Sequence, residues 1–543
     1  MTDDDLKAAA EAWLSGDPDP DTRAELRQLL ADGDTTELAD RFDGTLEFGT
    51  AGLRGAVAAG PNRMNRVVVI RAAAGLAAYL KAKGLTDGPV LIGYDARHKS
   101  DVFAQDTAAV MRGAGLDAVL IDRPTPTPVI AFGINHLRAV AGVVVTASHN
   151  PPQDNGYKVY LGDGSQIVPP ADAEIAAAIA AIGPLAELPR GEDWQTTGDD
   201  LLDAYLDRIA QLVPADAPRD LNVAYTPLHG VGRTLAEAAV ARAGFAVPQV
   251  VAAQADPDPD FPTVSFPNPE EPGAIDLALD LAREIDADIA VANDPDADRC
   301  AVAIPTADGG WRMLRGDELG SLLGEFLLQN ADGVAACSIV SSSLLGKIAQ
   351  AHGVRYVETL TGFKWIGRVP DLVFGYEEAL GYCVDPAAVK DKDGVSTLVR
   401  VLQLAAGAKA AGRTLQDLLD DLAIKYGLHA TDQLSVRVED LSLIAQAMER
   451  LRGTPLESLG DHTVERIDDL SEGSETLPPT DGLRYTLSDG ARVVVRPSGT
   501  EPKLKCYLEV VVPVSGGDVS AARSRAVNDL SGIKQALSTA LGI

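Results

Sequence analysis

Short apolar runs alternate with longer Ala- and Leu-rich stretches along most of the chain, and this alternation constrains the fold more than any other feature. The runs at 90–95, 118–122 and 139–147 have the length and continuity of strands that are covered on both faces. The stretch at 68–84 has the length and composition of a helix. Strands that alternate with helices predict α/β domains built on parallel sheets.

Breaks in this alternation indicate several domains. Polar and Pro-containing segments at 186–200 and 213–220 place the first boundary near residue 210. At roughly 150 residues per domain, 543 residues predict three or four domains. From about residue 430, short strands around turns predict an α+β domain with an antiparallel sheet. We expect short amphipathic helices in the first 40 residues and four domains: α/β domains at 1–210, 211–318 and 319–430, and an α+β domain at 431–543.

The composition is that of a soluble protein with an acidic surface. Hydrophobic residues make up 46% of the chain, and the formal net charge is -32. This charge repels nucleic acid and anionic lipid, so neither is an expected partner, and a site for a phosphorylated ligand must carry its own cations. No apolar run approaches the roughly 20 residues of a membrane helix, and the N-terminus does not resemble a signal peptide. The four scattered cysteines indicate a cytoplasmic protein without disulfides. A monomer or a homodimer is the expected assembly.

The segment DPDADR, residues 294–299, follows an apolar strand and contains three alternating aspartates. Open α/β sheets bind ligands at the carboxyl ends of strands, where this segment is expected. A cation would relieve the mutual repulsion of Asp294, Asp296 and Asp298, and their hard oxygen atoms favour Mg²⁺. An EF-hand is excluded because it requires Gly and Glu where this chain has Arg299 and Pro305. A phosphatase with an aspartyl nucleophile and a solvated acidic turn stay open as alternatives.

Another apolar run ends in a loop that carries Ser148 and His149. Adjacent side chains need not face each other, and the G-x-S-x-G motif is absent here, so the spacing does not indicate a catalytic triad. A strand end capped by polar side chains is the alternative to a nucleophilic serine. Asn155 and Gly156 predict a tight turn that brings the YKVY segment, with Lys158, back beside the loop.

Three further loops contain groups suited to a sugar phosphate. RPSGTEPK places a guanidinium group, two hydroxyls, a lysine and an unhindered backbone N–H in one turn, which is a phosphate-binding set; a basic hairpin turn is the alternative. GYEEALGY presents Glu377, which could accept hydrogen bonds from sugar hydroxyls, or it is simply an acidic loop. FGTAGLRG, with Arg54, lacks the spacing of a dinucleotide loop and predicts a backbone that approaches a ligand.

Taken in this order, TASHNP, DPDADR, GYEEALGY and RPSGTEPK resemble the four signature loops of the α-D-phosphohexomutase superfamily. The resemblance extends from FGTAGLRG to CYLE. TPLHGVG, FPTVSFPNPEEPG and TGFKWIG are most similar to the branch with phosphoglucomutase-2-type and bacterial phosphomannomutase-type enzymes, which also includes phosphopentomutases. The resemblance implies four domains around a central cleft: three related α/β domains with mixed sheets and a C-terminal α+β domain.

The resemblance also implies roles for individual residues. Ser148 would be carried phosphorylated and would hold Mg²⁺ together with Asp294, Asp296 and Asp298. The groups around the transferring phosphoryl would be Arg54, His149, Arg299 and Lys392, with Lys392 slightly preferred to His149 as the general base. The substrate-binding residues would be Thr361, Gly362, Lys364, Glu377, Arg496, Ser498, Gly499, Thr500 and Lys503. Ala379 stands where many relatives have a serine, which weakens the transfer of sugar specificity.

The reaction implied is the interconversion of hexose 1-phosphate and hexose 6-phosphate, of glucose or mannose, through phosphoserine and a hexose 1,6-bisphosphate. Phosphoryl transfer depends mostly on placement and charge neutralisation, which these loops supply. The expected partners are small-molecule sugar phosphates, with glucose 1,6-bisphosphate as activator. A phosphopentomutase is the nearest alternative. A magnesium-dependent phosphatase with Asp294 as nucleophile and a non-catalytic sugar-phosphate binding protein are more distant ones.

Overall fold

The computed structural model describes residues 1–438, 442–498 and 503–542. The chain forms two compact units. The first comprises Met1–Met313 and Leu380–Gly407, and the second comprises Leu314–Ala379 and Ala408–Ile543. Within the described residues, no helix is long and apolar enough to cross a membrane.

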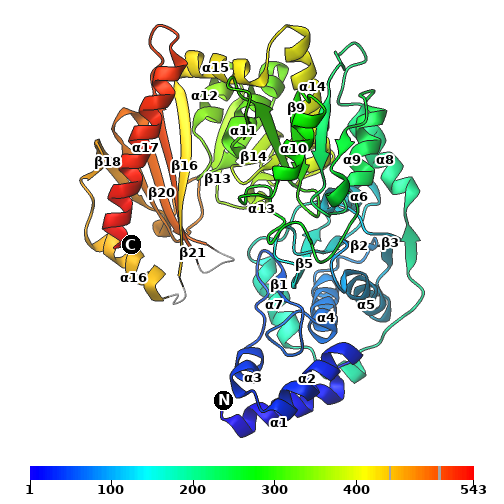
Figure 1. Cartoon of the computed structure of the whole chain (residues 1–543). Coiled ribbons are helices and arrows are strands. Elements are labelled where there is room, and N and C mark those ends of the chain that lie inside the picture. Colours follow the sequence, from blue (N-terminus) through cyan, green and yellow to red (C-terminus); the bar gives the residue numbers. More distant parts are fainter. Residues whose placement is uncertain (439–441, 499–502, 543) are drawn as a thin grey trace. The chain divides into compact units, whose positions relative to one another are not determined.

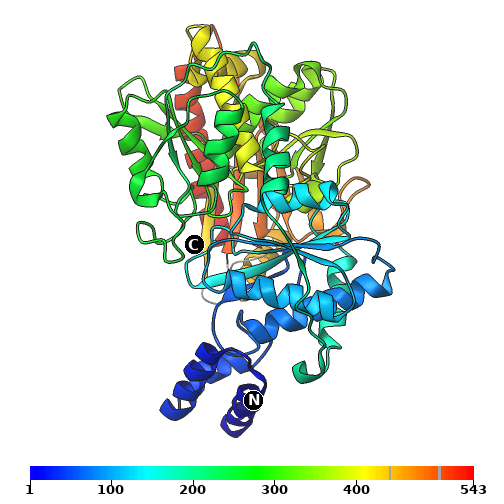
Figure 2. The same ribbon diagram turned by 90° about the vertical axis from the view of Figure 1, so that its right-hand side faces the viewer.

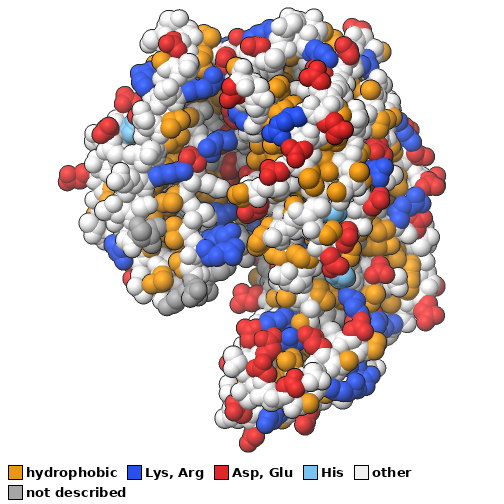
Figure 3. Space-filling model, in the orientation of Figure 1, with side chains coloured by type: hydrophobic (Ala, Val, Ile, Leu, Met, Phe, Trp, Pro, Cys, Tyr) orange, Lys and Arg blue, Asp and Glu red, His pale blue; other side chains and the backbone are white. Residues whose placement is uncertain are grey.

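Three short helices begin the first unit, as the sequence predicts. They are α1 (Asp3–Gly16), α2 (Pro20–Asp32) and α3 (Thr35–Phe42). Thr2 caps α1 through a capping box, and Gly33 ends α2 in the left-handed conformation that glycine adopts without a steric penalty. The three helices enclose a small core of their own around Leu26 and Leu38. They form the dark blue bundle at the N-terminus in Figure 2, and acidic side chains gather over them in Figure 3.

The first α/β domain has a six-stranded sheet of order β1-β5-β4-β2-β3-β6. Its strands are β1 (Leu53–Ala56), β2 (Val90–Tyr94), β3 (Ala118–Ile121), β4 (Ala141–Val145), β5 (Asp154–Leu161) and β6 (Gln195–Thr197). Its helices are α4 (Arg66–Ala82), α5 (Ser100–Gly113), α6 (Thr127–His136), α7 (Ala171–Ala180) and α8 (Asp199–Ala210). The predicted strands β2, β3 and β4 run parallel, but β5 is antiparallel to both β4 and β1. The sheet is therefore mixed, which agrees with the family resemblance rather than with an all-parallel pattern.

The tight turn predicted at Asn155 and Gly156 is wrong, because both residues lie inside β5. The buried Asn155 amide donates hydrogen bonds to His98 O and Ser100 Oγ, each at 2.9 Å. A side chain at Gly156 would meet Thr146 O at 2.5 Å, so glycine is required there by the close approach of the backbone. A dipeptide that is typical of turns is here selected by tertiary packing.

The second α/β domain completes the first unit. Its strands are β7 (Val223–Thr226), β8 (Gln249–Val250), β9 (Ile289–Asn293), β10 (Cys300–Pro305) and β11 (Trp311–Met313), in the sheet order β11-β10-β9-β7-β8. Its helices are α9 (Arg233–Arg242) and α10 (Asp276–Glu284). Because β9 and β10 pair in antiparallel fashion, residues 294–299 form the loop between them. The chain returns to this unit with β15 (Gly381–Cys383) and the start of α14 (Gly394–Ala410).

The second unit contains the third α/β domain and the C-terminal domain (Figure 1). The third domain has the parallel strands β12 (Val334–Ser338), β13 (Arg355–Thr359) and β14 (Leu372–Glu377), with α11 (Gly316–Leu327), α12 (Leu344–Ala351), α13 (Phe363–Ile366) and α15 (Leu415–Tyr426). The C-terminal domain has the antiparallel strands β16 (Leu428–Arg437), β17 (Ser458–Leu459), β18 (His462–Asp469), β19 (Leu483–Leu487), β20 (Arg492–Pro497) and β21 (Lys503–Val512). Helices α16 (Ser442–Gly453) and α17 (Val519–Leu541) pack against it through Met448, Ile533 and Leu537. The predicted change to an α+β fold is confirmed.

Candidate active site

The loop after β4 presents Ser148 in a strained backbone conformation. Ser148 has φ 51°, in the left-handed region, which costs a residue other than glycine about 1–2 kcal/mol. Its backbone N–H donates to Thr146 Oγ1 at 2.8 Å. Its buried hydroxyl donates to Asp294 Oδ2 at 2.8 Å and lies 3.2 Å from His149 Nδ1. Non-glycine residues in this region are concentrated at functional sites, and this serine meets the aspartate loop directly.

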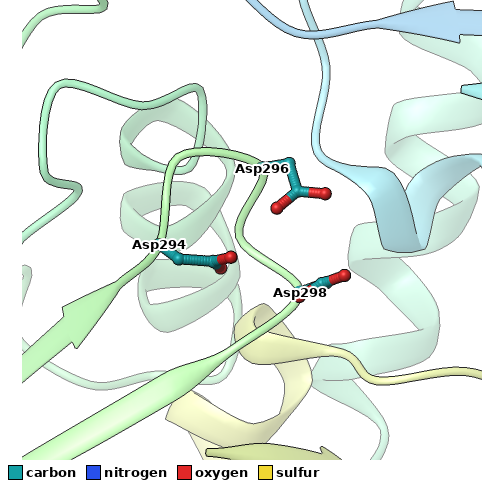
Figure 4. A group of neighbouring side chains, drawn as sticks. All are labelled: Asp294, Asp296 and Asp298. Carbon is teal, nitrogen blue, oxygen red and sulfur yellow. The ribbon is translucent and has the colours of Figure 1, made fainter. Parts of the chain in front are cut away.

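The three aspartates between β9 and β10 form one buried cluster. Figure 4 shows their carboxylates directed to the same side of the loop. Each side chain is at most 1% exposed, and one ligand atom from each lies within 4.8 Å of the others. Asp296 Oδ1 and Asp298 Oδ1 are buried and make no hydrogen bond. Because buried carboxylate oxygens normally accept hydrogen bonds, these two hard ligand atoms fit a divalent cation such as Mg²⁺.

Cationic side chains surround this aspartate cluster. Lys158 Nζ lies 2.7 Å from Asp296 Oδ2 and 3.0 Å from Asp298 Oδ2. Lys392 Nζ is 3.2 Å from Asp298 Oδ2, and Arg299 Nε is 3.9 Å from Asp298 Oδ1. These positive charges are the local cations that an acidic chain must supply at a site for anions.

The three carboxylates do not share this charge equally. Burial, and then repulsion from Asp296 and Asp298, raises the pKa of Asp294 well above its usual value. Burial also acts to raise the pKa of Asp298, but attraction from Lys158 and Lys392 outweighs it, and the pKa of Asp298 is lowered. The pKa values of these two carboxyl groups are therefore shifted in opposite directions.

His149 and Arg54 lie beside the serine. Arg54 comes from β1, and its Nη1 donates to Asn150 Oδ1 at 3.0 Å. Burial, and then the charges of Arg299 and Arg54, lowers the pKa of His149 well below its usual value. His149 is therefore neutral near pH 7, with one ring nitrogen facing the Ser148 hydroxyl.

Residues next to Lys392 in the chain make contacts that position it beside the aspartates. Tyr160 donates its hydroxyl proton to Asp391 Oδ2 at 2.6 Å, and Tyr205 donates to Asp393 Oδ1 at 2.8 Å. The backbone N–H of Gly394 donates to Ala297 O at 3.1 Å, inside the aspartate loop. The first unit thus brings together Arg54, Ser148, His149, Asp294, Asp296, Asp298, Arg299 and Lys392, which lie on four separate stretches of sequence.

The remaining predicted residues lie in the second unit. Glu377 Oε1 accepts a hydrogen bond from Gly362 N at 2.7 Å, which joins Glu377 to the loop with Thr361 and Lys364. In the hairpin between β20 and β21, the backbone N–H of Ser498 donates to Lys503 O at 2.8 Å, next to Arg496 at the end of β20. Gly499 and Thr500 lie outside the described residues. The described residues of these two expected substrate loops therefore lie within this unit.

Two residues that contact the aspartates, Lys158 and Thr127, are not among the site residues predicted from the sequence. Thr127 Oγ1 donates to Asp296 Oδ2 at 2.5 Å, and its backbone N–H donates to Asp296 O at 3.0 Å. The position of Lys158 on a strand after the serine loop could have indicated its direction, because side chains alternate along a strand. Thr127 stands at the start of α6 with no sequence signal of such a contact.

Matches to models of known protein families identify the class of this protein. Four family models match in chain order, described as phosphoglucomutase/phosphomannomutase α/β/α domains I, II and III and C-terminal domain, at residues 45–185, 203–309, 315–426 and 434–515. Four such domains define a mutase, an enzyme that transfers a phosphoryl group within a molecule. The chain belongs to the phosphoglucomutase/phosphomannomutase family, within the α-D-phosphohexomutase superfamily.

Individual relatives carry different names. The chain is 49% identical over 456 residues to the "Probable phosphomannomutase" of Haemophilus influenzae, covering 82% of this chain and 93% of the relative. It is 35% identical over 568 residues to the "Phosphopentomutase" of Homo sapiens, covering 93% and 91%. A solved phosphoglucomutase/phosphomannomutase family protein from Burkholderia thailandensis has the same fold, with a TM-score of 0.69 and 21% identity over 91% of this chain and 97% of that one.

Proposed function

We propose that the chain interconverts hexose 1-phosphate and hexose 6-phosphate, of glucose or mannose, with Ser148 as phosphoryl carrier. The observation that carries this proposal is the 2.8 Å hydrogen bond from the Ser148 hydroxyl to Asp294, at the edge of a buried aspartate cluster. A serine hydroxyl is a weak nucleophile until a neighbouring group accepts its proton and cations neutralise the phosphoryl oxygens. Hydrogen-bond acceptors lie within contact distance of the serine hydroxyl, and cationic side chains lie within contact distance of the aspartates.

The residues of the first unit have separate tasks in this transfer. Asp294, Asp296 and Asp298, with an oxygen of phosphorylated Ser148, would hold Mg²⁺, which when bound neutralises charge on the phosphoryl oxygens. Arg54 and Arg299 offer guanidinium donors to the remaining phosphoryl oxygens. Lys158 keeps the carboxylates of Asp296 and Asp298 in place through its paired ammonium.

Two protons must move, one at the serine and one at the sugar. His149 Nδ1, at 3.2 Å, and Asp294 Oδ2, at 2.8 Å, are the acceptors that face Ser148 Oγ. Lys392 Nζ is ion-paired with Asp298 Oδ2 at 3.2 Å. We therefore assign His149 to the serine proton and keep Lys392 as the candidate base for the sugar hydroxyl.

The second unit supplies the groups proposed to bind the sugar phosphate. Glu377 would accept hydrogen bonds from sugar hydroxyls, next to Thr361, Gly362 and Lys364. The phosphate that does not react would bind Arg496, Ser498, Gly499, Thr500 and Lys503, an expectation that also covers the two residues outside the described structure. The intermediate would be a hexose 1,6-bisphosphate that turns end for end, and free glucose 1,6-bisphosphate would restore phosphoserine to an enzyme that has lost it.

A pentose 1-phosphate is the second candidate substrate. The similarity to the human phosphopentomutase extends over 93% of this chain, and Ala379 provides no hydroxyl for a sugar contact. Identity to the probable phosphomannomutase is higher, at 49%, which supports the hexose assignment. Ratios of kcat/KM for glucose, mannose and ribose 1-phosphates compare the candidates directly.

Intact mass spectrometry tests the carrier role. Incubation with glucose 1,6-bisphosphate should add the mass of one phosphoryl group, peptide mapping should place it on Ser148, and mutase activity should accompany it. Ser148→Ala should lose both the added mass and the activity. The matched control Ser321→Ala changes a buried serine on α11 and should keep both. Label on Asp294 would support a phosphatase instead, and ligand binding without turnover would support a binding protein.

A further inference from the structure

Arg97 donates hydrogen bonds to backbone carbonyls of the serine loop. Its Nη2 donates to Ser148 O at 2.7 Å and Asn150 O at 2.5 Å, and its Nη1 donates to Pro151 O at 2.8 Å and Asp154 O at 3.0 Å. These four carbonyls extend from Ser148 to the first residue of β5, over most of the connection between β4 and β5. A guanidinium group is the side chain that can do this, because its donors are fixed in a planar fork.

The arginine is itself buried and held on two sides. It is 4% exposed, and its Nε lies 3.5 Å from the buried carboxylate of Asp95. The ring of Phe261 covers the guanidinium group, with the ring centroid 4.9 Å from Arg97 Cζ. Cations prefer this position over an aromatic face, and a desolvated pair of this kind is stronger than an exposed one.

The TPLHGVG segment, which the proposed mechanism does not use, holds Phe261 in place. The rings of His229 and Phe261 meet edge to face, with centroids 6.5 Å apart, and His229 Nε2 hydrogen-bonds Thr263 Oγ1 at 2.8 Å. The same segment touches the aspartate loop, because Val231 N donates to Pro295 O at 2.8 Å. A continuous set of contacts therefore runs from the aspartate loop to the serine loop.

We propose that Arg97, braced by Phe261, is a positioning residue that fixes the loop of residues 148–154 so that the Ser148 hydroxyl meets Asp294; this rests on the proposed carrier role of Ser148. Without its carbonyl contacts, the left-handed backbone at Ser148 has less to hold it, and the loop relaxes. Arg97 is not among the residues proposed to bind the sugar phosphate. Its loss should therefore lower the transfer rate rather than substrate binding.

Arg97→Lys is the sharpest variant, because lysine keeps the positive charge beside Asp95 but cannot reach four carbonyls from one nitrogen atom. We expect kcat to fall by roughly 10- to 100-fold, as for a small misplacement of a reacting group. KM should stay unchanged, and phosphoryl uptake from glucose 1,6-bisphosphate should slow to a similar extent. Hydrogen–deuterium exchange should become faster in peptides that contain residues 148–154, with little change elsewhere in the domain.

Arg66→Lys is the matched control. Arg66 forms a two-pronged pair with Asp106 in the same domain, at 2.7 and 2.9 Å, and does not contact the serine loop. Kinetics and loop exchange of this variant should match the wild type. Phe261→Leu keeps every hydrogen bond of Arg97 and removes only the ring, so it should show the same pattern to a smaller degree.

Each result bears on the proposal. Wild-type kcat and loop exchange in Arg97→Lys would overturn it, as would a rise in KM with unchanged kcat. If Arg97→Lys does not fold, Phe261→Leu decides: unchanged kcat and exchange there would also overturn the proposal. If the wild-type enzyme forms no phosphoserine on incubation with glucose 1,6-bisphosphate, the proposed function fails, but exchange still tests the positioning role. Faster exchange confined to the loop would support that role, and unchanged exchange would refute it.

Discussion

Replacing Lys158 with methionine tests whether the aspartate cluster depends on a buried ammonium group. Lys158 Nζ lies 2.7 and 3.0 Å from two carboxylates, and the three side chains are only 7%, 0% and 1% exposed. Removing one partner of a buried pair costs about 3–5 kcal/mol, because the remaining charge is left uncompensated. At roughly 2–4 °C per kcal/mol for domains of this size, Tm should fall by about 6–20 °C. Mg²⁺ should then raise the Tm of Lys158→Met more than that of the wild type, because the carboxylates have lost a counter-charge.

Differential scanning calorimetry with EDTA and with Mg²⁺ measures both effects. Lys83→Met is the matched control, since Lys83 Nζ lies 2.8 Å from Glu174 in the same domain but the two side chains are 45% and 39% exposed. An exposed pair contributes at most about 1 kcal/mol, so this variant should unfold within a few degrees of the wild type and respond to Mg²⁺ as the wild type does. Equal losses of Tm in the two variants would refute the reasoning, and so would equal increments with Mg²⁺.

Three further predictions concern the aspartate loop, the ionisation of Glu509 and removal of the metal. In Gly230→Ala, the new Cβ would meet the Cα and O atoms of Pro295 at 2.3 and 2.4 Å, so displacement of the aspartate loop should raise the Mg²⁺ concentration needed for half-maximal activity and lower kcat by roughly tenfold or more; an unchanged Mg²⁺ titration would contradict this. Burial opposes ionisation of Glu509, but Arg492 and its hydrogen-bond partners lower its pKa to about 2 from 4.5. The lowered pKa contributes about 3 kcal/mol of stability above pH 4.5, which is lost as pH falls towards 2; Glu509→Gln should flatten this part of the acid-unfolding curve, and an unaltered curve would count against it. Chelation with EDTA should abolish turnover without unfolding the protein, and added Mg²⁺ should restore it; full activity in EDTA would exclude the metal role.

Local sequence was sufficient where a feature depends on neighbouring residues. The strands β2, β3 and β4 were predictable because strands covered on both faces are continuously apolar. The aspartate cluster was predictable because all three carboxylates lie on one short loop at a strand end. In contrast, Asn155 and Gly156 suggested a turn, since the packing of Gly156 against Thr146 O cannot be seen in the dipeptide.

Contacts between distant segments required the structure. Lys158 pairs with Asp296 and Asp298 across 138 and 140 residues of sequence, and Arg97 reaches the serine loop from 51 to 57 residues away. The amino acid types at these positions are common on solvated surfaces, so nothing local separates them from other basic residues. Their roles depend on which strands pair and on which side chains are then removed from water.

By itself, the sequence determined the alternation of strands and helices, the change to an antiparallel C-terminal domain, and the loops that carry the serine, the aspartates and the groups proposed to bind phosphate. These depend on hydrophobic periodicity and on residues only a few positions apart, both of which a linear chain displays. The tertiary structure alone decided that Ser148 donates to Asp294, that Lys158 balances the buried carboxylates and that Arg97 holds the serine loop. The physical reason is that charge and hydrogen bonding act through space, and burial strengthens them only after folding has excluded water.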